Sequence, residues 1–212
     1  KINQIKLLAY LHDATAAQKA FLATFRPTDG YAACPEYNLT GTKTGRLTTI
    51  SGPSILGLKK DYRNVITSKF GDEGSIWILD YSALEPRVLL SLSGAQNIPQ
   101  DIYLDIIGKL DLVDKIPRDI IKLVVISMLY GQLEHNTEEQ IKEYTSKPGD
   151  LIQAVKDYFH TDSVVEKLSQ ELAINDSKYI TNYYGREILC EDGRNSVLLN
   201  YYIQSTAVVI AL

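Results

Sequence analysis

The stretch that decides the fold is residues 75–94, SIWILDYSALEPRVLLSLSG. Its first part, residues 75–81, is short, apolar and rich in β-forming residues, and it predicts a buried strand that ends in the acid Asp80. Residues 82–85 then match a helix capping box, so a helix is expected to continue through Leu92. A strand, an acid and a helix in direct succession predict a fold that contains both sheet and helix.

The flanking sequence is consistent with an α+β fold. On the N-terminal side, residues 5–25 have helical spacing and predict one helix, and residues 31–58 are rich in Thr, Gly and Pro and predict loops with short strands. On the C-terminal side, Pro117 is expected to open a helix, and residues 179–189 predict a hairpin or bent strand around Gly185. The helices expected there span residues 101–110, 117–129, 137–144, 150–158, 163–172 and 197–212.

Composition excludes several classes of protein. The 212 residues are 45% hydrophobic and 23% charged, which is typical of a globular domain with a real core. Two distant cysteines, Cys34 and Cys190, argue against a disulfide scaffold or a zinc site and fit a reducing compartment. The chain begins at Lys1 rather than Met, as expected of a processed chain or of a piece of a longer one.

The chain is acidic as a whole but contains a local basic stretch. The net charge of −4 argues mildly against a nucleic-acid binder. Between residues 43 and 69, however, several cations accompany a single acid, Asp61. Such a stretch can hold phosphates on an acidic protein. The alternative is a solvated loop face. The cations are Lys43, Arg46, Lys59, Lys60, Arg63 and Lys69.

Four residues of the helix expected at 117–129 and its end share one face. Arg118, Lys122, Ile126 and Tyr130 are four residues apart, and at ~100° per residue they occupy a face about 120° wide and ~18 Å long. The two cations can hold a triphosphate, and the ring can contact a base. The ordinary alternative is a helix with solvated cations and a packed Ile and Tyr.

Two other features allow a functional and a structural interpretation. Asp80, at the end of a strand and before a turn, is where folds with strands and helices place functional groups, but it can equally cap a helix or pair with a cation. Asn200 and Gln204 lie four apart on the last expected helix and can reach minor-groove edges. They can also be buried amides bonded to the backbone.

Six segments in one order resemble the family A DNA polymerases, the group that contains bacterial polymerase I and many phage replicases. TGRLTT at 44–49 resembles the family's Thr-Gly-Arg-Leu-Ser-Ser segment, DYSALEPRV at 80–88 resembles motif A, and Leu92-Ser93-Gly94 follows it. Asp101-Ile102-Tyr103 resembles the Asp-Ile-His/Tyr segment. The Arg118, Lys122, Tyr130, Gly131 spacing resembles motif B, and residues 184–186 and 200–207 resemble the segments that follow.

The resemblance implies a fold and a function. It implies an antiparallel palm sheet with a mostly helical fingers domain: the end of a thumb helix at 1–27, palm at 28–98, fingers at 99–180 and a return to the palm at 181–212. It implies template-directed transfer of deoxynucleotides to a primer 3′-hydroxyl, with two Mg²⁺ ions, dNTP and primer–template DNA as partners, in the cytoplasm of a bacterial or phage-infected cell.

The resemblance also implies roles for single residues. Asp80 is then a metal carboxylate, with the Tyr81 carbonyl as an extra ligand. Arg118 and Lys122 hold the triphosphate, and Ile126 and Tyr130 lie near the nascent base pair. Glu85 excludes a ribose 2′-hydroxyl, and Tyr103 lies beside the phosphates or sugar. The residues expected on DNA are Arg46, Lys59, Lys60, Arg63, Asn200 and Gln204.

Departures from the family pattern limit the resemblance. Ile126 stands where an aromatic ring is usual, which puts base stacking in doubt, and Ala83 replaces a common Gln. Residues 54–57 replace an Asn-rich template-contacting run, and Ser196 stands where an Arg is usual, although Arg194 is close.

The largest departure is an absence. Motif C, His-Asp-Glu on a hairpin, is expected after the final helix, and the sequence reaches only Leu212. His12-Asp13 is a His-Asp pair, so a permuted motif C is one alternative. The favoured interpretations are a fragment or one half of a split polymerase whose partner carries motif C. A non-catalytic nucleic-acid-binding piece remains the competing function.

Overall fold

The computed structural model describes residues 1–112, 115–132, 134–174, 178–190 and 195–211, with the side chains of residues 195 and 196 left undescribed. Within these residues the chain is α+β, as predicted, with helices and two separate two-stranded antiparallel sheets. It divides into two compact units, Lys1–Asp80 (unit 1) and Tyr81–Leu212 (unit 2). The sequence departures at Arg194 and Ser196 lie outside the described side chains.

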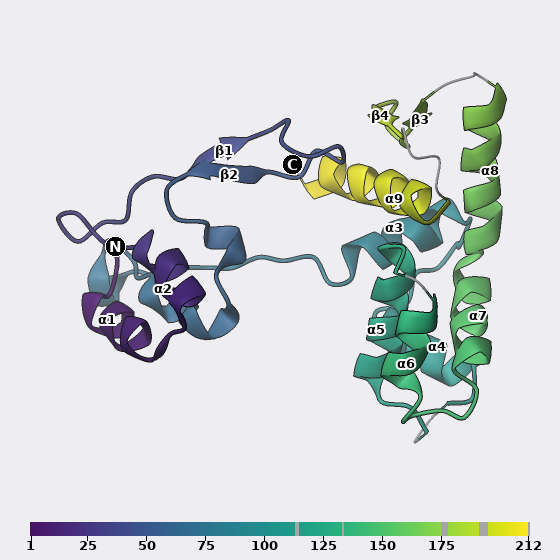
Figure 1. The fold of residues 1–212 in the computed structure, drawn as a ribbon, viewed down its shortest axis with the longest axis horizontal. Coiled ribbons are helices and arrows are strands. Elements are labelled where there is room, and N and C mark those ends of the chain that lie inside the picture. Colours follow the sequence, from purple (N-terminus) through teal and green to yellow (C-terminus); the bar gives the residue numbers. More distant parts are fainter. Residues whose placement is uncertain (113–114, 133, 175–177, 191–194, 212) are drawn as a thin grey trace. The chain divides into compact units, whose positions relative to one another are not determined.

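Unit 1 is built from short elements (Figure 1). Strands β1 and β2 pair antiparallel, with Tyr37 opposite Thr49 and Asn38 opposite Thr48. A small core packs the first helix pair against η2. The elements are α1 (Gln4–Asp13), α2 (Ala16–Ala23), β1 (Glu36–Asn38), β2 (Thr48–Ser51), η1 (Ile55–Gly57), η2 (Lys60–Val65) and η3 (Gly71–Glu73).

The expectation of one helix over residues 5–25 was wrong, because Thr15 begins a second helix. Ala14 is extended, and the Thr15 hydroxyl accepts from the Gln18 N–H at 3.4 Å while Gln18 Oε1 accepts from the Thr15 N–H at 2.9 Å. This capping box satisfies helix-end groups at the break. Local hydrogen bonding therefore overrides a continuous helical pattern.

The strand expected at residues 75–81 is also wrong. The segment is irregular, and its apolar side chains are exposed, with Trp77 at 82% and Leu79 at 90%. A strand needs a partner for its N–H and C=O groups, and none of the described residues supplies a ladder there. The apolar pattern is present, but the partner that would make it a buried strand is not.

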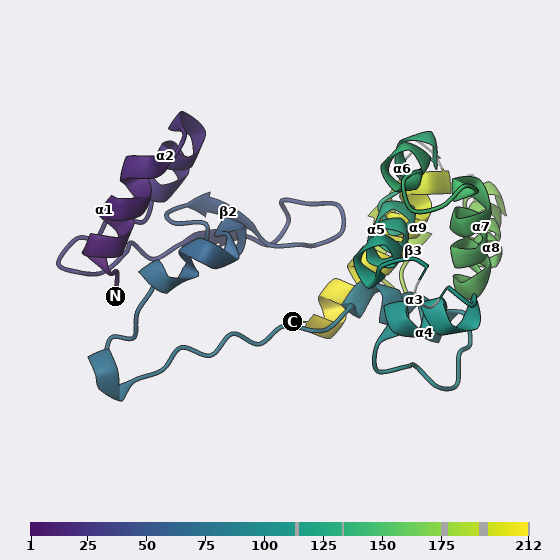
Figure 2. The ribbon, with the colours of Figure 1, turned by 90° about the horizontal axis from the view of Figure 1, so that it is seen from below.

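Unit 2 is mostly helical (Figures 1 and 2). Helix α5 contacts α3, α4, α6, α7 and α9, so it lies at the centre of the unit. The elements are α3 (Leu84–Leu92), α4 (Ile102–Lys109), α5 (Arg118–Leu129), α6 (Glu134–Ile141), α7 (Pro148–Phe159), α8 (Thr161–Ile174), β3 (Tyr179–Thr181), β4 (Glu187–Leu189) and α9 (Asn195–Ala211). The predicted helices and hairpin of this part are thus confirmed, with ends shifted by up to a few residues.

The start of α3 differs from the sequence prediction. The residue before the helix is Ala83, with φ 52° in the left-handed region, and no side chain caps the helix. The capping box expected at residues 82–85 is therefore wrong. Instead, Arg87 Nε donates to the Ser82 carbonyl at 2.7 Å and its NH2 donates to the Gln100 carbonyl at 2.6 Å. Arg87 thus fixes the chain that enters α3.

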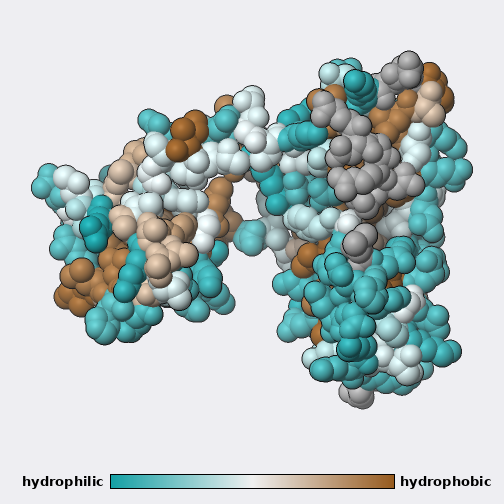
Figure 3. Space-filling view, viewed as in Figure 1, coloured by the Kyte–Doolittle hydropathy of each residue, from teal (hydrophilic) through white to brown (hydrophobic). Residues whose placement is uncertain are grey.

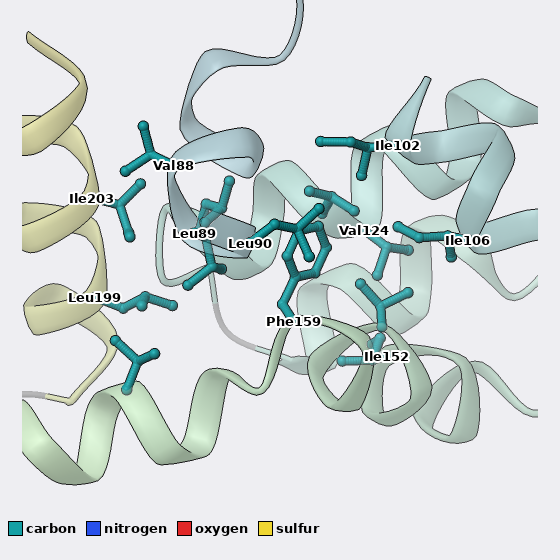
Figure 4. Close-up of a cluster of buried hydrophobic side chains, with 14 of the residues drawn as sticks. Val88, Leu89, Leu90, Ile102, Ile106, Val124, Ile152, Phe159, Leu199 and Ile203 are labelled. Atoms are coloured by element: carbon teal, nitrogen blue, oxygen red, sulfur yellow. The ribbon is translucent and has the colours of Figure 1, made fainter. Parts of the chain in front are cut away.

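The core of unit 2 fills the space between its helices. Figure 4 shows the Phe159 ring in the middle of this cluster, among side chains from α3, α5 and α7. Leu89, Ile121 and Phe159 are completely buried. Cys34 is exposed and Cys190 is buried, and no disulfide joins them in the described part of the chain. No helix in the described ranges combines the length and apolar character needed to cross a membrane.

Candidate nucleotide site

The four predicted residues of α5 lie on its outer face, as the four-residue spacing indicated. Arg118 is half-buried, Lys122 is exposed, and Ile126 and Tyr130 are 39% and 46% exposed. The opposite face packs into the core with residues that are almost fully buried, namely Ile121, Val124, Val125 and Leu129. The helix is therefore amphipathic, with one face buried in the core and the other accessible from solvent. Its two cations lie on the accessible face, as binding of a nucleotide requires.

Arg118 is held in place from two sides. Its Nε and one NH2 group both donate to Asp101 Oδ2 at 2.8 Å, and its guanidinium lies over the Tyr103 ring, 4.8 Å from the ring centre. Asp101 Oδ1 at the same time caps α4 by accepting from the N–H groups of Tyr103 and Leu104. One carboxylate thus ties the start of α4 to the first residue of α5.

These contacts shift two ionisation equilibria. Burial alone would raise the pKa of Asp101, but the hydrogen bond and charge of Arg118 and the two α4 N–H groups lower this pKa below its usual value. Burial raises the pKa of Tyr103, with Arg118 opposing and with Asp101 and Glu85 adding to the rise. Tyr103 therefore stays neutral, and Asp101 stays ionised, throughout the physiological range.

The other end of the α5 face contacts α3. The Tyr130 hydroxyl donates to Glu85 Oε1 at 3.3 Å, and Glu85 is half-buried in the first turn of α3. We call Glu85, Asp101, Tyr103, Arg118 and Tyr130 the α5 cluster. Helices α3, α4 and α5 each contribute to it, so residues far apart in sequence come together beside one exposed helix face.

Lys122 lies between the two ends of this face. It is exposed, and no ion pair to it is found within the described ranges. Arg118, by contrast, has its charge compensated by Asp101 and, at 3.9 Å, by Asp119. The face therefore offers one oriented and one solvated cation, a suitable pair for a polyphosphate.

Asp80 and Tyr81 stand at the division between the units. Asp80 is the exposed last residue of unit 1, and Tyr81, 57% exposed, is the first of unit 2. Mg²⁺ is commonly held by one or two carboxylates together with substrate phosphates and water, so Asp80 fits one such ligand. Over the described part of the chain, no three His, Cys, Asp or Glu side chains gather into a metal site. This applies to His12 and Asp13, which contact one another at 2.6 Å on the exposed end of α1.

The predicted DNA-contacting residues divide between the units. In unit 1, Arg46 is exposed beside β2, and Lys59, Lys60 and Arg63 are exposed in and next to η2. In unit 2, Asn200 is half-buried on α9 and Gln204 is 8% exposed and interacts within the protein. Their contacts with DNA stay predictions, and Gln204 requires a side-chain movement before it can reach a ligand.

Sequence reasoning missed the role of Asp101. The resemblance identifies Asp101 only as the first residue of the Asp-Ile-Tyr segment, although an Asp before an apolar helix is a recognisable cap. Its second partner, Arg118, lies 17 residues further along the chain, and no local sequence pattern predicts the contact between them.

The comparisons with known proteins bear on the fold. The sequence matches no protein-family model and no curated protein sequence. The structure is similar to the POL domain of Pol1 from M. smegmatis, solved in complex with DNA primer-template and dNTP, with a TM-score of 0.64 and 16% sequence identity over 92% of this chain. The match spans 38% of that polymerase chain. The fold is thus similar to that of a DNA polymerase domain.

Proposed function

We propose that the chain is the palm-and-fingers part of a family A template-directed DNA polymerase. The observation that carries the proposal is the exposed α5 face, where Lys122 and the α5 cluster residue Arg118 supply two cations in a fold similar to a polymerase domain. The six sequence segments support the same function independently of the fold, because their order and residue types follow the family pattern along the chain.

In this function, the α5 face binds the incoming deoxynucleotide. Arg118 and Lys122 bind the phosphates, and Asp101 and the Tyr103 ring keep the guanidinium in position. Glu85 and Tyr130, joined by their hydrogen bond, form a wall against the sugar and base. A carboxylate at this wall would exclude a ribose 2′-hydroxyl. Each of these roles uses Lys122 or a side chain of the α5 cluster.

Asp80 would act on the primer side of the reaction. The primer 3′-hydroxyl loses its proton to solvent, and its oxygen forms a bond to the α-phosphorus of the nucleotide. The bond from that phosphorus to the β-phosphate bridging oxygen breaks, releasing pyrophosphate. Mg²⁺ held by Asp80 and the Tyr81 carbonyl would lower the hydroxyl pKa and neutralise charge on the leaving group. A two-metal mechanism also uses a second carboxylate beside Asp80.

Nucleotide binding tests the proposal without requiring turnover. The purified chain should bind a dNTP, and Arg118→Ala or Lys122→Ala should weaken binding about tenfold each, because each removes one phosphate-binding cation. Lys167→Ala, which removes an exposed cation from α8, is the matched control and should bind as the unchanged chain does. Equal loss in all three variants would reject a specific site on α5.

Primer extension tests the catalytic part. Extension is measured with this chain alone and with a candidate partner that supplies the missing carboxylate. Asp80→Ala should abolish extension while DNA binding persists, and Glu85→Ala should raise ribonucleotide incorporation. Extension by Asp80→Ala at the normal rate would remove Asp80 from the mechanism. DNA binding without extension under either condition would favour the non-catalytic alternative.

A further inference from the structure

Arg87 joins the two loops from which helices α3 and α4 begin. Its Nε donates to the Ser82 carbonyl at 2.7 Å, and its Nη2 donates to the Gln100 carbonyl at 2.6 Å. Ser82 lies just before the start of α3, and Gln100 directly precedes Asp101, the cap of α4. We call these two hydrogen bonds the Arg87 bridge. One guanidinium thus connects the starts of two helices.

The Arg87 bridge is a direct link between helices that otherwise share little contact. Within the described ranges, α3 packs mainly on α5 and α9, and α4 packs mainly on α5, without extensive packing of α3 on α4. At the start of α3, Ala83 has a left-handed backbone with φ 52° and no side-chain cap. Such a conformation persists only where surrounding contacts hold it, and the bond to the Ser82 carbonyl is one such contact.

Each end of the bridge lies next to a residue of the α5 cluster. Glu85, in the first turn of α3, accepts from the Tyr130 hydroxyl at 3.3 Å. Asp101, at the start of α4, holds the Arg118 guanidinium at 2.8 Å. The Arg87 bridge therefore helps to set the separation between the Glu85 carboxylate and the Arg118 guanidinium.

The chemistry of the bridge favours a role in position over a role in stability. Both hydrogen bonds go to backbone carbonyls, and the planar guanidinium directs its N–H groups at fixed angles, so that both distances are restrained together. Ser82 and Gln100 are exposed, so water can replace the lost bonds at small cost if Arg87 is removed. The positions of the two helix starts, however, would then be less well defined.

We propose that Arg87 is a positioning residue for sugar specificity. The inference rests on the proposed function, in which Arg118 binds the nucleotide phosphates and Glu85 excludes a ribose 2′-hydroxyl. A hydroxyl group is small, so its exclusion requires that the phosphate-binding group and the excluding group be held to within about 0.5 Å of one arrangement. Without the bridge, the start of α3 can move away from Asp101, and a ribonucleotide then fits.

Nucleotide binding by Arg87→Met tests the proposal. This substitution keeps a long side chain over the half-buried stem and removes the donors. The affinities for dATP and ATP are measured with Mg²⁺ present. The unchanged chain should prefer dATP at least about tenfold, and Arg87→Met should reduce this preference to about threefold or less, chiefly by binding ATP more tightly. A preference within about twofold of that of the unchanged chain would overturn the proposal.

Two further variants separate the bridge from charge. Arg87→Lys keeps the positive charge but offers a single amine on a flexible stem, so it should lose sugar preference as Arg87→Met does. Full preference in Arg87→Lys would assign the effect to charge and overturn the bridge. Lys167→Met removes an exposed cation from α8 by the same substitution and should leave the preference unchanged. An equal loss in Lys167→Met would also overturn the proposal.

A double-variant cycle tests whether Arg87 acts through Glu85. Glu85→Ala should itself reduce the preference for dATP, and Arg87→Met should cause no further reduction in that background, because the group that it positions is already absent. If the two reductions multiply, Arg87 affects sugar preference independently of Glu85, which would overturn the positioning role.

A structural readout requires no nucleotide. The N–H groups of Tyr103 and Leu104 donate to Asp101, so their NMR signals report on the start of α4. In Arg87→Met these signals should shift and their hydrogen exchange should quicken, while the melting temperature stays within about 3 °C of that of the unchanged chain. Unchanged signals would overturn the bridge. A melting temperature lowered as far as in a variant with a truncated core would assign Arg87 to stability instead.

The failure of this inference is distinguishable from the failure of the proposed function. If nucleotides bind with an affinity that depends on Arg118 and Lys122, but sugar preference does not depend on Arg87, only the positioning role is rejected. If no nucleotide binds in a way that depends on Arg118 and Lys122, both are rejected.

Discussion

The two units differ in how much of their apolar surface they bury. In unit 1 the buried side chains form one small cluster between α1, α2 and η2: Ile2, Leu7, Leu22, Phe25, Leu58 and Val65. In unit 2 a continuous core draws on α3 through α9 and the β3–β4 hairpin. Burial is the main favourable term in folding, so the comparison indicates that unit 2 is the self-supporting part of the molecule.

The two units also differ in the apolar surface that they leave exposed. Figure 3 shows apolar surface over α1 and α2 of unit 1, where Ile5 and Leu8 are 82% and 65% exposed. The segment at 75–81 adds Trp77 and Leu79. Contiguous exposed apolar surface marks a contact site more often than an isolated residue does. Unit 1 therefore has the surface of a domain that gains stability when another segment or partner covers it.

The largest effect is expected when the units are separated. A fragment of residues 81–212 should retain a cooperative thermal transition and strong helical circular dichroism, because its core is intact. A fragment of residues 1–80 should show weak helicity and little cooperativity, since its buried cluster is small. Thermal melts and hydrogen exchange of both fragments check this. A cooperative melt of the shorter fragment at the same temperature would contradict the comparison.

A core truncation should produce the next largest effect. Ile121→Ala, at a fully buried position of α5, should lower the free energy of unfolding of unit 2 by about 2–5 kcal/mol. Ile126→Ala, on the exposed face of the same helix, makes the same chemical change and should cost less than about 1 kcal/mol. Chemical denaturation of both variants measures the difference. Equal costs would mean that α5 does not pack as described.

The difference between Ile121 and Ile126 also shows which structural features the sequence could predict. The four-residue spacing placed Arg118, Lys122 and Tyr130 on one face, and the structure agrees, because helical periodicity is local information. The strand at residues 75–81 was predicted from an equally local pattern and is absent, because a strand exists only with a partner. The contact of Asp101 with Arg118 depended on tertiary packing, which no local spacing encodes.

The family resemblance predicted more of the fold than the residue spacing did. It indicated a polymerase fold, and the structural similarity agrees. Functional side chains in a fixed order are a more specific signal of fold than helical periodicity is. It did not reveal the left-handed Ala83 or the Arg87 contacts that replace the expected capping box. Those features arise from the path of the chain into α3, which the motif residues do not specify.

Alkaline titration should affect unit 2 through Tyr158. Burial raises the pKa of Tyr158 well above its usual value, and so does its hydrogen bond to Asp105 Oδ2 at 2.6 Å. A raised pKa in the folded state stabilises the fold below the unfolded value of about 10, and this contribution is lost as pH rises above it. Tyr158→Phe should cost about 1–3 kcal/mol at neutral pH.

The pH dependence separates the hydrogen bond from packing. The stability difference between the unchanged chain and Tyr158→Phe should shrink above about pH 10, because the unfolded tyrosine then ionises while the phenylalanine cannot. Denaturation series at neutral and alkaline pH give both values. A difference that stays constant across this range would show that Tyr158 acts only by filling space.

The smallest effect is expected at Asp101, which combines a helix cap with an ion pair. Asp101→Asn keeps a capping oxygen for α4 but removes the charge that faces Arg118, and should cost less than about 1 kcal/mol because both side chains are about one-third exposed to screening solvent. Asp101→Ala removes both contacts and should cost about 1 kcal/mol more. Thr15→Ala in unit 1 removes the matching cap of α2 without an ion pair.

The acid dependence of these variants identifies the ion pair. The lowered pKa of Asp101 means that its charge stabilises the fold above the unfolded value of about 3.9, and that this contribution is lost as pH falls through the folded pKa. The difference between the unchanged chain and Asp101→Asn should therefore disappear in acid, while the additional cost of Asp101→Ala persists because it reflects the cap. If the Asn difference is unchanged in acid, the Arg118 contact makes no electrostatic contribution to unit 2.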